Sequence, residues 1–362
     1  MFFLLYPTKT TIVLPSSAIL RISSVGLPLT LMTVYHGTVA KLDHLTRTVT
    51  VTPAEAGKAE MELEYDALII ATGVTTQSPL MGLSGNHQNT IEAWTSFRKK
   101  VSAAKSIVIT GGGATGVETA GELGQFLNSN TSGKPKVKIT LVTKSNQLLS
   151  YLPPSLAQKA EKQLSNLGVS IIKNRVVEKV VSVDADAVNG AGQSLERLTD
   201  AVVVHLDHDQ TLQADLYIPA TGVSPNTTFV NSQLLDDEGY VIVHPSSLQV
   251  ESAGPRVYAL GHVCSSDPRA IHAIMKQVPV VGENLKQDLL AAENSNQSHD
   301  RAYRAYEPES KVTQLVVIGK KGVGMFSGWR VPSYFVWLIK GRDYWVDMTP
   351  PMWNGKAFAK AI

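Results

Sequence analysis

A glycine-rich turn in the middle of the chain constrains the fold more than any other feature. The stretch VITGGGATGVETAGEL, residues 108–123, places Gly111, Gly113 and Gly116 between a β-type run and a helical run, with Glu118 at a fixed offset. The first glycine of such a pattern allows a tight turn, the second lets the backbone approach a pyrophosphate, and the third lets the helix pack against the strand. The free N–H groups at the helix start then attract phosphates. The pattern predicts a nucleotide-binding unit here rather than a merely structural turn.

Two other segments resemble each other at identical spacing. Residues 66–73 read DALIIATG, and residues 215–222 read DLYIPATG. Each is a buried-strand pattern that ends in small residues, which allow a close backbone approach at the carboxyl end of the strand. The match predicts a duplicated nucleotide-binding domain.

The duplication also predicts that one glycine turn is missing. In the second copy, Gly222 lies 111 positions after Gly111, and the same interval counted back from Gly73 gives position −38. Residues 1–65 hold no GxGxxG pattern. We therefore expect the first domain to be incomplete, with its phosphate-binding turn upstream of Met1. We further expect the apolar bursts within 1–14 to cover the sheet edge that this leaves open.

Strand and helix patterns alternate along the chain, which predicts an α/β protein built on doubly wound parallel sheets. The expected units are two Rossmann-like dinucleotide-binding domains, of which the first is incomplete, and a small C-terminal α+β unit. We expect helices at 153–169 and 270–290 and a polar linker over 291–310. The predicted boundaries are 1–103 for the first part of the first domain, 104–252 for the second domain, 253–300 for a return to the first domain, and 301–362 for the C-terminal unit.

Composition excludes several functions. Lysine and arginine number 33 against 31 aspartate and glutamate, so the chain has no large excess of basic residues of the kind that binds nucleic acid. The one cysteine, Cys264, permits neither an internal disulfide nor a CxxC pair, and it fits a buried side chain in a cytoplasmic protein. The nine histidines show no metal-ligand spacing, so we expect no metal site and place His205 and His208 in loops.

One apolar segment near the C-terminus has two interpretations. No run in the chain approaches the roughly 20 apolar residues that cross a bilayer. The stretch VPSYFVWLIKGRDYWV, residues 331–346, combines aromatic and aliphatic side chains with basic ones. It is typical of core packing or a domain interface, and the alternative is a peripheral contact with a membrane surface.

Taken together and in this order, four stretches resemble the flavoprotein family with two dinucleotide-binding domains. They are YDALIIATG, VITGGGATGVETAGEL, IPATGVSPN and VYALGHV. The later stretch 316–345 is similar to the apoptosis-inducing-factor-like branch, and the resemblance extends from about residue 34 onward. In that family an N-terminal glycine turn binds FAD and a second one binds NADH or NADPH. Hydride passes from nicotinamide to flavin and then to a quinone or another acceptor.

The resemblance implies positions for the nicotinamide nucleotide. Gly111, Gly113 and Gly116 would hold its pyrophosphate, and Thr221 with Gly222 would line the nicotinamide side. Glu118 would lie near the nicotinamide end. The alternative for Glu118 is a carboxylate in the first helical turn that only complements the helix dipole. No side chain has to act as an acid or base, so we name no catalytic residue.

The resemblance also implies positions for the flavin, with two departures. Ala71, Thr72 and Gly73 would line the flavin side. Gly261 and His262 stand where the family has Gly-Asp and uses the aspartate to accept a ribityl hydroxyl. A neutral imidazole can hydrogen-bond but does not reproduce an anionic acceptor. This substitution and the missing glycine turn both weaken the predicted hold on FAD.

The choice between NADH and NADPH depends on the end of the second strand of this domain. A carboxylate there would bind the ribose 2′-OH and repel a 2′-phosphate. The chain has Thr143 where the family often has glutamate, with Lys144 beside it. We therefore expect NADPH to be accepted as well as NADH. The alternative is that Lys144 is simply a solvated surface lysine.

Two functions follow. The first is an FAD-dependent NAD(P)H oxidoreductase of the apoptosis-inducing-factor-like type that reduces a quinone or another small acceptor. The second is a non-catalytic, truncated paralogue that keeps nicotinamide-nucleotide binding and acts as an interaction or sensing module. In either case, an open sheet edge would favour pairing with a partner, for example in a homodimer.

Overall fold

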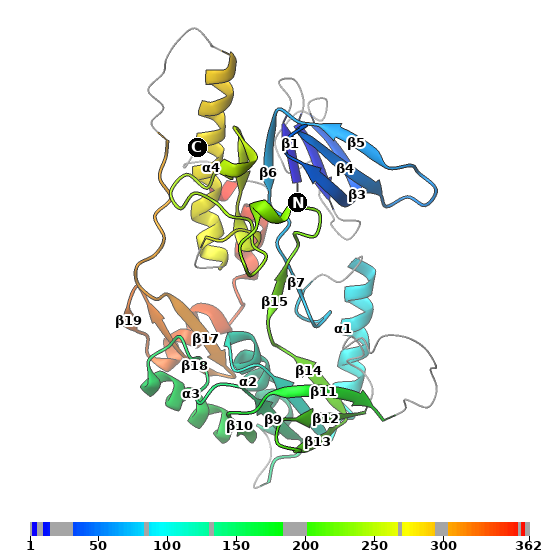
Figure 1. The fold of residues 1–362 in the computed structure, drawn as a ribbon. Coiled ribbons are helices and arrows are strands. Elements are labelled where there is room, and N and C mark those ends of the chain that lie inside the picture. Colours follow the sequence, from blue (N-terminus) through cyan, green and yellow to red (C-terminus); the bar gives the residue numbers. More distant parts are fainter. Residues whose placement is uncertain are drawn as a thin grey trace.

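The α/β fold predicted from the sequence is confirmed by the computed structural model. Two sheets lie one beyond the other, joined by a narrow two-stranded ribbon, and the C-terminal part of the chain packs beside the second sheet (Figure 1). No helix in the described ranges has the length and apolarity needed to span a bilayer. The structure describes residues 2–5, 10–14, 32–82, 87–129, 134–183, 201–266, 270–293, 303–353 and 356–358.

The first sheet has seven strands in the order β16-β6-β1-β2-β3-β4-β5. β1 pairs antiparallel with β6, on the side of β6 away from β16, so the first apolar burst does cover this edge as expected. β16 runs parallel to β6, and the chain therefore returns to this sheet after building the second one. The strands are β1 (Phe2–Leu5), β2 (Thr10–Leu14), β3 (Met32–Asp43), β4 (Thr48–Pro53), β5 (Met61–Glu64), β6 (Ala67–Ile70) and β16 (Val257–Ala259).

Helix α4 (Ile271–Glu293) covers part of this sheet and shares its core. The buried core includes Leu68, Ile70 and Val281. The Tyr258 hydroxyl on β16 donates to Asp288 Oδ2 on α4 over 2.7 Å, and burial raises the pKa of Tyr258. This bond fixes the helix against the strand.

The second sheet is fully parallel, in the order β10-β9-β8-β14. Its strands are nearly continuous apolar runs because both faces are covered. Helices α2 and α3 pack on one face, and the antiparallel sheet β11-β12-β13 covers the other. The elements are β8 (Ser106–Thr110), α2 (Ala114–Asn128), β9 (Lys138–Val142), α3 (Pro154–Asn166), β10 (Val169–Ile172), β11 (Val177–Ser182), β12 (Val202–Leu206), β13 (Thr211–Ala214) and β14 (Leu216–Pro219).

The two sheets are joined by the ribbon of β7 (Val74–Thr76) and β15 (Val223–Pro225), which pair antiparallel. Each strand directly follows one of the two Ala-Thr-Gly repeats. Gly73 and Gly222 have matching left-handed φ angles of +67° and +62°, conformations that glycine adopts without strain. The repeat in the sequence therefore produces two matching turns, and the strands after them pair with each other. Short elements between and beyond the sheets are α1 (His87–Val101), η4 (Ser232–Leu234), η5 (Glu251–Ala253) and η6 (Gly261–Val263).

The C-terminal part of the chain forms a small sheet followed by short helices, and it packs on α2. A Cβ added to Gly121 on α2 would lie 2.8 Å from Ile318 Cα, so a glycine is needed for this close approach. The elements are β17 (Gln314–Ile318), β18 (Lys321–Phe326), β19 (Trp329–Arg330), α5 (Ser333–Val336), the π-helical η7 (Trp337–Gly341), η8 (Val346–Met348), α6 (Thr349–Trp353) and η9 (Lys356–Phe358).

Two local predictions were wrong. The polar segment that begins at residue 291 is not all linker, because α4 continues to Glu293. His205 lies within strand β12, opposite Thr211, and not in a loop. His208 does lie in the turn that follows this strand, with a φ angle of +57°. Cys264 is fully buried, as expected.

The aspartates that open the two repeats fix neighbouring strands. Asp215 Oδ2 accepts from the backbone N–H groups of Lys105 and Ser106 over 2.7 and 2.8 Å, at the start of β8. In the first repeat, Asp66 Oδ1 accepts from Arg256 Nη2 over 2.7 Å, just before β16. Each carboxylate therefore sets the start of the parallel strand beside its own.

Replacing Asp215 by asparagine is expected to lower the free energy of unfolding by about 1 kcal/mol at neutral pH, after allowance for solvent screening. The Lys105 N–H bond, with those of Ser106, lowers the pKa of Asp215 in the folded chain. Its stabilising effect is therefore present above the unfolded pKa of about 3.9 and is lost as the pH falls through the lower folded value. Urea titrations at several pH values should show the two proteins converging in acid. A constant difference at all pH values would contradict this account.

Candidate functional site

The glycine turn forms a cradle that is closed on two sides and open on one. A Cβ on Gly111, whose φ is +118°, would come 2.2 Å from Ala220 O, and one on Gly116 would come 1.9 Å from Gly111 O. A Cβ on Gly113 would meet nothing within 4 Å. Gly113 caps α2 without a side-chain hydrogen bond, so the first N–H groups of the helix have no side-chain cap. Gly111 and Gly116 are therefore needed for close packing of the backbone, whereas Gly113 leaves space for a ligand.

The carboxyl ends of β8, β9 and β14 meet at this cradle. Thr110 is paired with Val142 on one side and with Pro219 on the other. Thr221 follows β14, and its Cγ2 lies 3.3 Å from the Cβ position of Gly111. The Thr221 hydroxyl donates to Gln77 Oε1 over 3.1 Å, and Gln77 directly follows strand β7 of the ribbon. The structure thus brings the predicted nicotinamide-side residues, including Gly222, to the edge of the sheet where the turn lies.

Thr143 and Lys144 stand at the end of β9 with different exposures. Thr143 is buried, its hydroxyl accepts from the Ser145 N–H over 3.3 Å, and the same oxygen lies 2.4 Å from the Cβ position of Gly112. Lys144 is exposed and makes no ion pair with any residue that the structure describes. Arg175 donates its backbone N–H to Thr143 O over 3.1 Å, which brings a second basic residue to this end of the sheet.

Ala71, Thr72 and Gly73 follow β6. Asn226, which follows strand β15, holds this turn through three hydrogen bonds. The Thr72 hydroxyl donates to Asn226 O over 2.8 Å, and Asn226 Nδ2 donates back to Thr72 O over 2.9 Å. Asn226 also donates its backbone N–H to Gly73 O over 3.0 Å. The backbone of the predicted flavin-side turn is therefore held in one conformation.

Gly261 and His262 lie beside this turn. The Leu260 N–H donates to Ile70 O over 3.1 Å, which places Gly261 next to the end of β6. Gly261 has a φ of +80° and donates its N–H to Gln277 Oε1 on α4 over 2.8 Å. His262 follows in the short helix η6 and is partly buried. The structure thus brings the predicted flavin-side residues together at the carboxyl ends of β6 and β16.

Glu118 does not point into the open side of the cradle as a free carboxylate. Its Oε1 accepts from Lys340 Nζ over 2.5 Å and from the Val317 N–H over 3.0 Å. One turn later, Glu122 accepts from the Tyr344 hydroxyl over 2.9 Å, and burial raises the pKa values of both groups. The first turn of α2 contains no acidic residue, so the alternative of a first-turn carboxylate for Glu118 was wrong.

A cavity of about 830 Å³ lies between the start of α4, the segment 307–314 and the C-terminal unit. Lys340 lines this cavity and also donates to Glu118. His272 lines it from α4, two residues before Ile274, whose side chain lies 3.7 Å from the Cβ position of Gly261. The cavity lining is thus linked to Glu118 through Lys340, and His272 stands two residues along α4 from a neighbour of Gly261.

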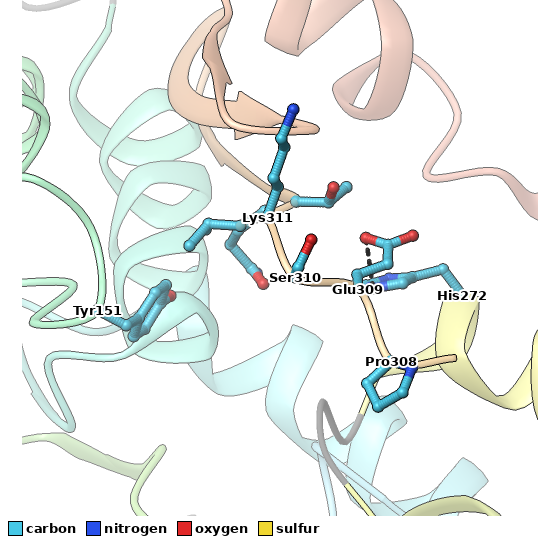
Figure 2. A pocket seen from close by; sticks show the side chains of 9 residues that line it. Tyr151, His272, Pro308, Glu309, Ser310 and Lys311 are labelled. Atoms are coloured by element: carbon cyan, nitrogen blue, oxygen red, sulfur yellow. Dashed lines mark ion pairs between the residues drawn. The ribbon is translucent and has the colours of Figure 1, made fainter. Parts of the chain in front are cut away.

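Charged and titratable groups gather at a wall that this cavity shares with a smaller neighbouring cavity, which is the one drawn in Figure 2. Lys276 Nζ donates to Glu309 Oε1 over 2.7 Å, and this bond lowers the pKa of Glu309. His272 Nε2 lies 3.8 Å from the other oxygen of Glu309. The smaller cavity, of about 480 Å³, reaches Tyr151, whose pKa is raised by burial and by the charge of Glu118. None of these residues belongs to a recognisable motif, and sequence reasoning missed them.

The residues fit a nicotinamide dinucleotide and fit a flavin only in part. The open side of the cradle at Gly113 matches a pyrophosphate at a helix start. The turn 71–73 and Gly261 offer backbone at the ends of two parallel strands. Between β6 and β3, the described part of the first sheet holds β1 and β2, with no glycine turn and helix such as follow β8. No described residue there takes the role of a phosphate cradle.

Relatives of the chain fit this geometry. A model of the pyridine nucleotide-disulphide oxidoreductase family matches residues 14–278. Oxidoreductase phnG of Penicillium herquei is 44% identical over 332 residues, which cover 90% of this chain and 77% of that protein. Ferroptosis suppressor protein 1 of Xenopus tropicalis is 26% identical over 296 residues, which cover 79% of this chain and 71% of that protein.

Solved structures share the fold. The structure of NDH2 from Plasmodium falciparum in complex with NADH has a TM-score of 0.58 at 14% identity, and it covers 91% of this chain and 84% of that one. Three other matched structures are of longer chains, and this chain spans 48% to 56% of their length.

The family model and the similar proteins place the chain in the class of flavin-dependent NAD(P)H oxidoreductases. The chain belongs to the pyridine nucleotide-disulphide oxidoreductase family, and the resemblance to apoptosis-inducing-factor-like flavoproteins is confirmed. With one cysteine, the chain itself lacks the cysteine pair that a redox disulfide requires.

Proposed function

We propose that the chain is an FAD-dependent NAD(P)H oxidoreductase that passes hydride from nicotinamide to flavin and on to a quinone or another small acceptor. The observation that carries the proposal is the cradle at Gly113, which is open while its two flanking glycines are tightly enclosed. In this account, residues 104–252 bind the nicotinamide nucleotide. Residues 1–103 and 253–300 form the flavin side, and 301–362 form the C-terminal unit.

The nicotinamide nucleotide would be held mainly by backbone. The N–H groups at the start of α2 point to where its pyrophosphate would lie, and the helix dipole favours negative charge there. Gly111 and Gly116 shape the turn, and Thr221 with Gly222 line the path toward the ribbon. Glu118, held by Lys340, would border the nicotinamide end from the side of the cavity.

The flavin would be held at its ring end. Bound FAD would accept a hydride from the nicotinamide and deliver two electrons to the acceptor. The chain contributes the clamped turn 71–73 and the left-handed Gly261, and His262 would hydrogen-bond where the family uses an aspartate. We assign no residue to its pyrophosphate.

The acceptor would enter the cavity of about 830 Å³. Phe326, Ile339 and Trp345 supply apolar walls, while Lys276 and Glu309 supply the polar wall. The lining combines apolar side chains with polar and charged ones, and the apolar walls would contact the ring of a planar organic acceptor such as a quinone. His272 completes this wall, with its Nε2 3.8 Å from Glu309 Oε2.

The test of this function is the flavin content of the purified chain. The proposal expects a yellow protein that releases FAD on denaturation and whose flavin is bleached by NADPH or NADH. A colourless protein that still binds either nucleotide would favour the second candidate, a module for nucleotide sensing or protein interaction.

Replacing Lys144 by glutamate is expected to weaken NADPH binding by roughly tenfold or more and to change NADH binding little. The exposed ammonium group would otherwise face the 2′-phosphate, and a carboxylate would repel it. Dissociation constants for both nucleotides, measured by fluorescence titration, give the ratio. Lys138→Glu is the matched control, because Lys138 is also exposed but stands at the opposite end of β9. Equal weakening of both nucleotides would contradict the assignment of Lys144.

A further inference from the structure

The C-terminal unit exposes an unusual set of large apolar side chains. Trp329 is 78% exposed, Phe326 61% and Tyr334 60%. Large apolar side chains gathered in one region of a protein surface mark interaction sites, whereas singly scattered ones are ordinary. We call this set the aromatic face, and its members are Phe326, Trp329, Tyr334, Phe335, Leu338, Ile339 and Trp345.

Several members of the aromatic face contact one another or line a common cavity. Phe326 and Trp329 are partners across β18 and β19. Phe326, Ile339 and Trp345 line the same cavity. On the helix, the rings of Tyr334 and Phe335 contact each other edge to face, with centroids 6.1 Å apart.

The helical segment of this unit, α5 and η7, has one buried side and one exposed side, which explains why the aromatic face is exposed. Val336 is buried and packs under the small sheet with Val317, and Lys340 turns toward Glu118 on α2. Phe335, which precedes Val336, and Leu338 and Ile339, which precede Lys340, are left on the outside. Core packing therefore accounts for only one side of the segment 331–346.

Exposed positive charge lies beside the aromatic face at Lys311 and Arg330. Lys311 is exposed, and its Cδ lies 3.3 Å from the Cβ position of Gly328, in the turn between β18 and β19. Arg330 is exposed and directly follows Trp329. Residues 311–348 contain six lysines and arginines against two aspartates, a formal charge of +4, whereas the whole chain has +2. The remainder of the chain is therefore net negative, and the positive charge is concentrated here.

We propose that the aromatic face docks on the surface of an anionic lipid bilayer. Tryptophan and tyrosine rings suit the headgroup region because they are apolar with one polar end, and basic residues add attraction to anionic lipid. The contact is peripheral. This proposal goes beyond the proposed oxidoreductase activity and does not depend on it.

Co-sedimentation of the full chain with sucrose-loaded vesicles tests the proposal. We expect binding to vesicles of phosphatidylcholine with phosphatidylserine, weaker binding to phosphatidylcholine alone, and weakening by added salt. Absence of binding to the anionic vesicles would overturn the proposal. Because the readout is sedimentation, it is independent of whether the chain binds FAD or NADPH.

Substitutions locate the contact. Trp329→Ser and Phe335→Ser are each expected to reduce partitioning onto anionic vesicles by roughly tenfold. Arg330→Gln is expected to reduce it by roughly fivefold. Trp94→Ser is the matched control, because Trp94 is 50% exposed on α1, outside the aromatic face, and should leave partitioning unchanged.

Two results would contradict this location. Equal partitioning of Trp329→Ser and the unchanged chain would show that another surface binds lipid. A dimer in light scattering that Trp329→Ser and Phe335→Ser convert to monomers, with no lipid binding by the unchanged chain, would show that the aromatic face meets a second copy. Circular dichroism of each variant checks that the fold is retained.

Discussion

Replacing Gly116 by alanine is expected to lower the free energy of unfolding by at least about 3 kcal/mol. The added Cβ would lie 1.9 Å from Gly111 O, inside van der Waals contact. Gly111 cannot retreat, because its N–H donates to Val142 O over 2.9 Å and its own Cβ position lies 2.2 Å from Ala220 O. The helix would have to move away from β8, which opens the core that it shares with α3.

The sign of this effect makes it diagnostic. In a helix interior, glycine to alanine ordinarily stabilises by up to about 1 kcal/mol, because alanine loses less backbone entropy on folding. Gly282 on α4 supplies the control, since a Cβ there would meet nothing within 4 Å. Urea unfolding should show Gly282→Ala neutral or stabilising and Gly116→Ala strongly destabilising. Similar midpoints for the two variants would show that α2 does not pack on β8 as described.

Replacing Gly113 by alanine is expected to weaken the binding of NADPH and NADH by roughly tenfold to a hundredfold. The methyl group would stand in the open side of the cradle, where the backbone must approach the pyrophosphate. One or two charge-assisted hydrogen bonds from the start of α2 would then be lengthened or lost. Isothermal titration with each nucleotide measures the change.

The free energy of unfolding of the Gly113→Ala variant is the control, because it shows whether the substitution disturbs the fold. Gly113 has an ordinary φ of −78° and an open Cβ position, so the substitution should change the free energy of unfolding by less than about 1 kcal/mol. A variant that binds as before would mean that the phosphate does not approach at Gly113. A variant that is strongly destabilised would leave Gly113 as a packing residue like Gly116.

Local backbone demands made much of the second sheet predictable. Gly111, Gly116 and the two Ala-Thr-Gly repeats mark turns and close approaches that few other residues permit, so spacing alone identified them. Strands buried on both faces read as continuous apolar runs, which located β8, β9 and β14. The repeat of aspartate at 66 and 215 was visible, but its role in fixing a neighbouring strand was not.

Contacts between distant segments could not be predicted. Glu118 and Lys340 are 222 positions apart, and nothing near either residue signals the ion pair. The cavity walls come from α4, the segment 307–314 and the C-terminal unit, which meet only in the folded chain. The antiparallel course of β1 against β6 also followed no local signal, because an apolar run of four residues suits either direction.

The central claim is that the start of α2 binds a nicotinamide dinucleotide, and equilibrium titration of the purified, intact chain with NADPH and NADH tests it most directly. The account predicts saturable binding of one nucleotide per chain, weakened by Gly113→Ala and unaffected by Gly282→Ala. A chain that is folded by circular dichroism and urea unfolding, yet binds neither nucleotide at any accessible concentration, would contradict the account.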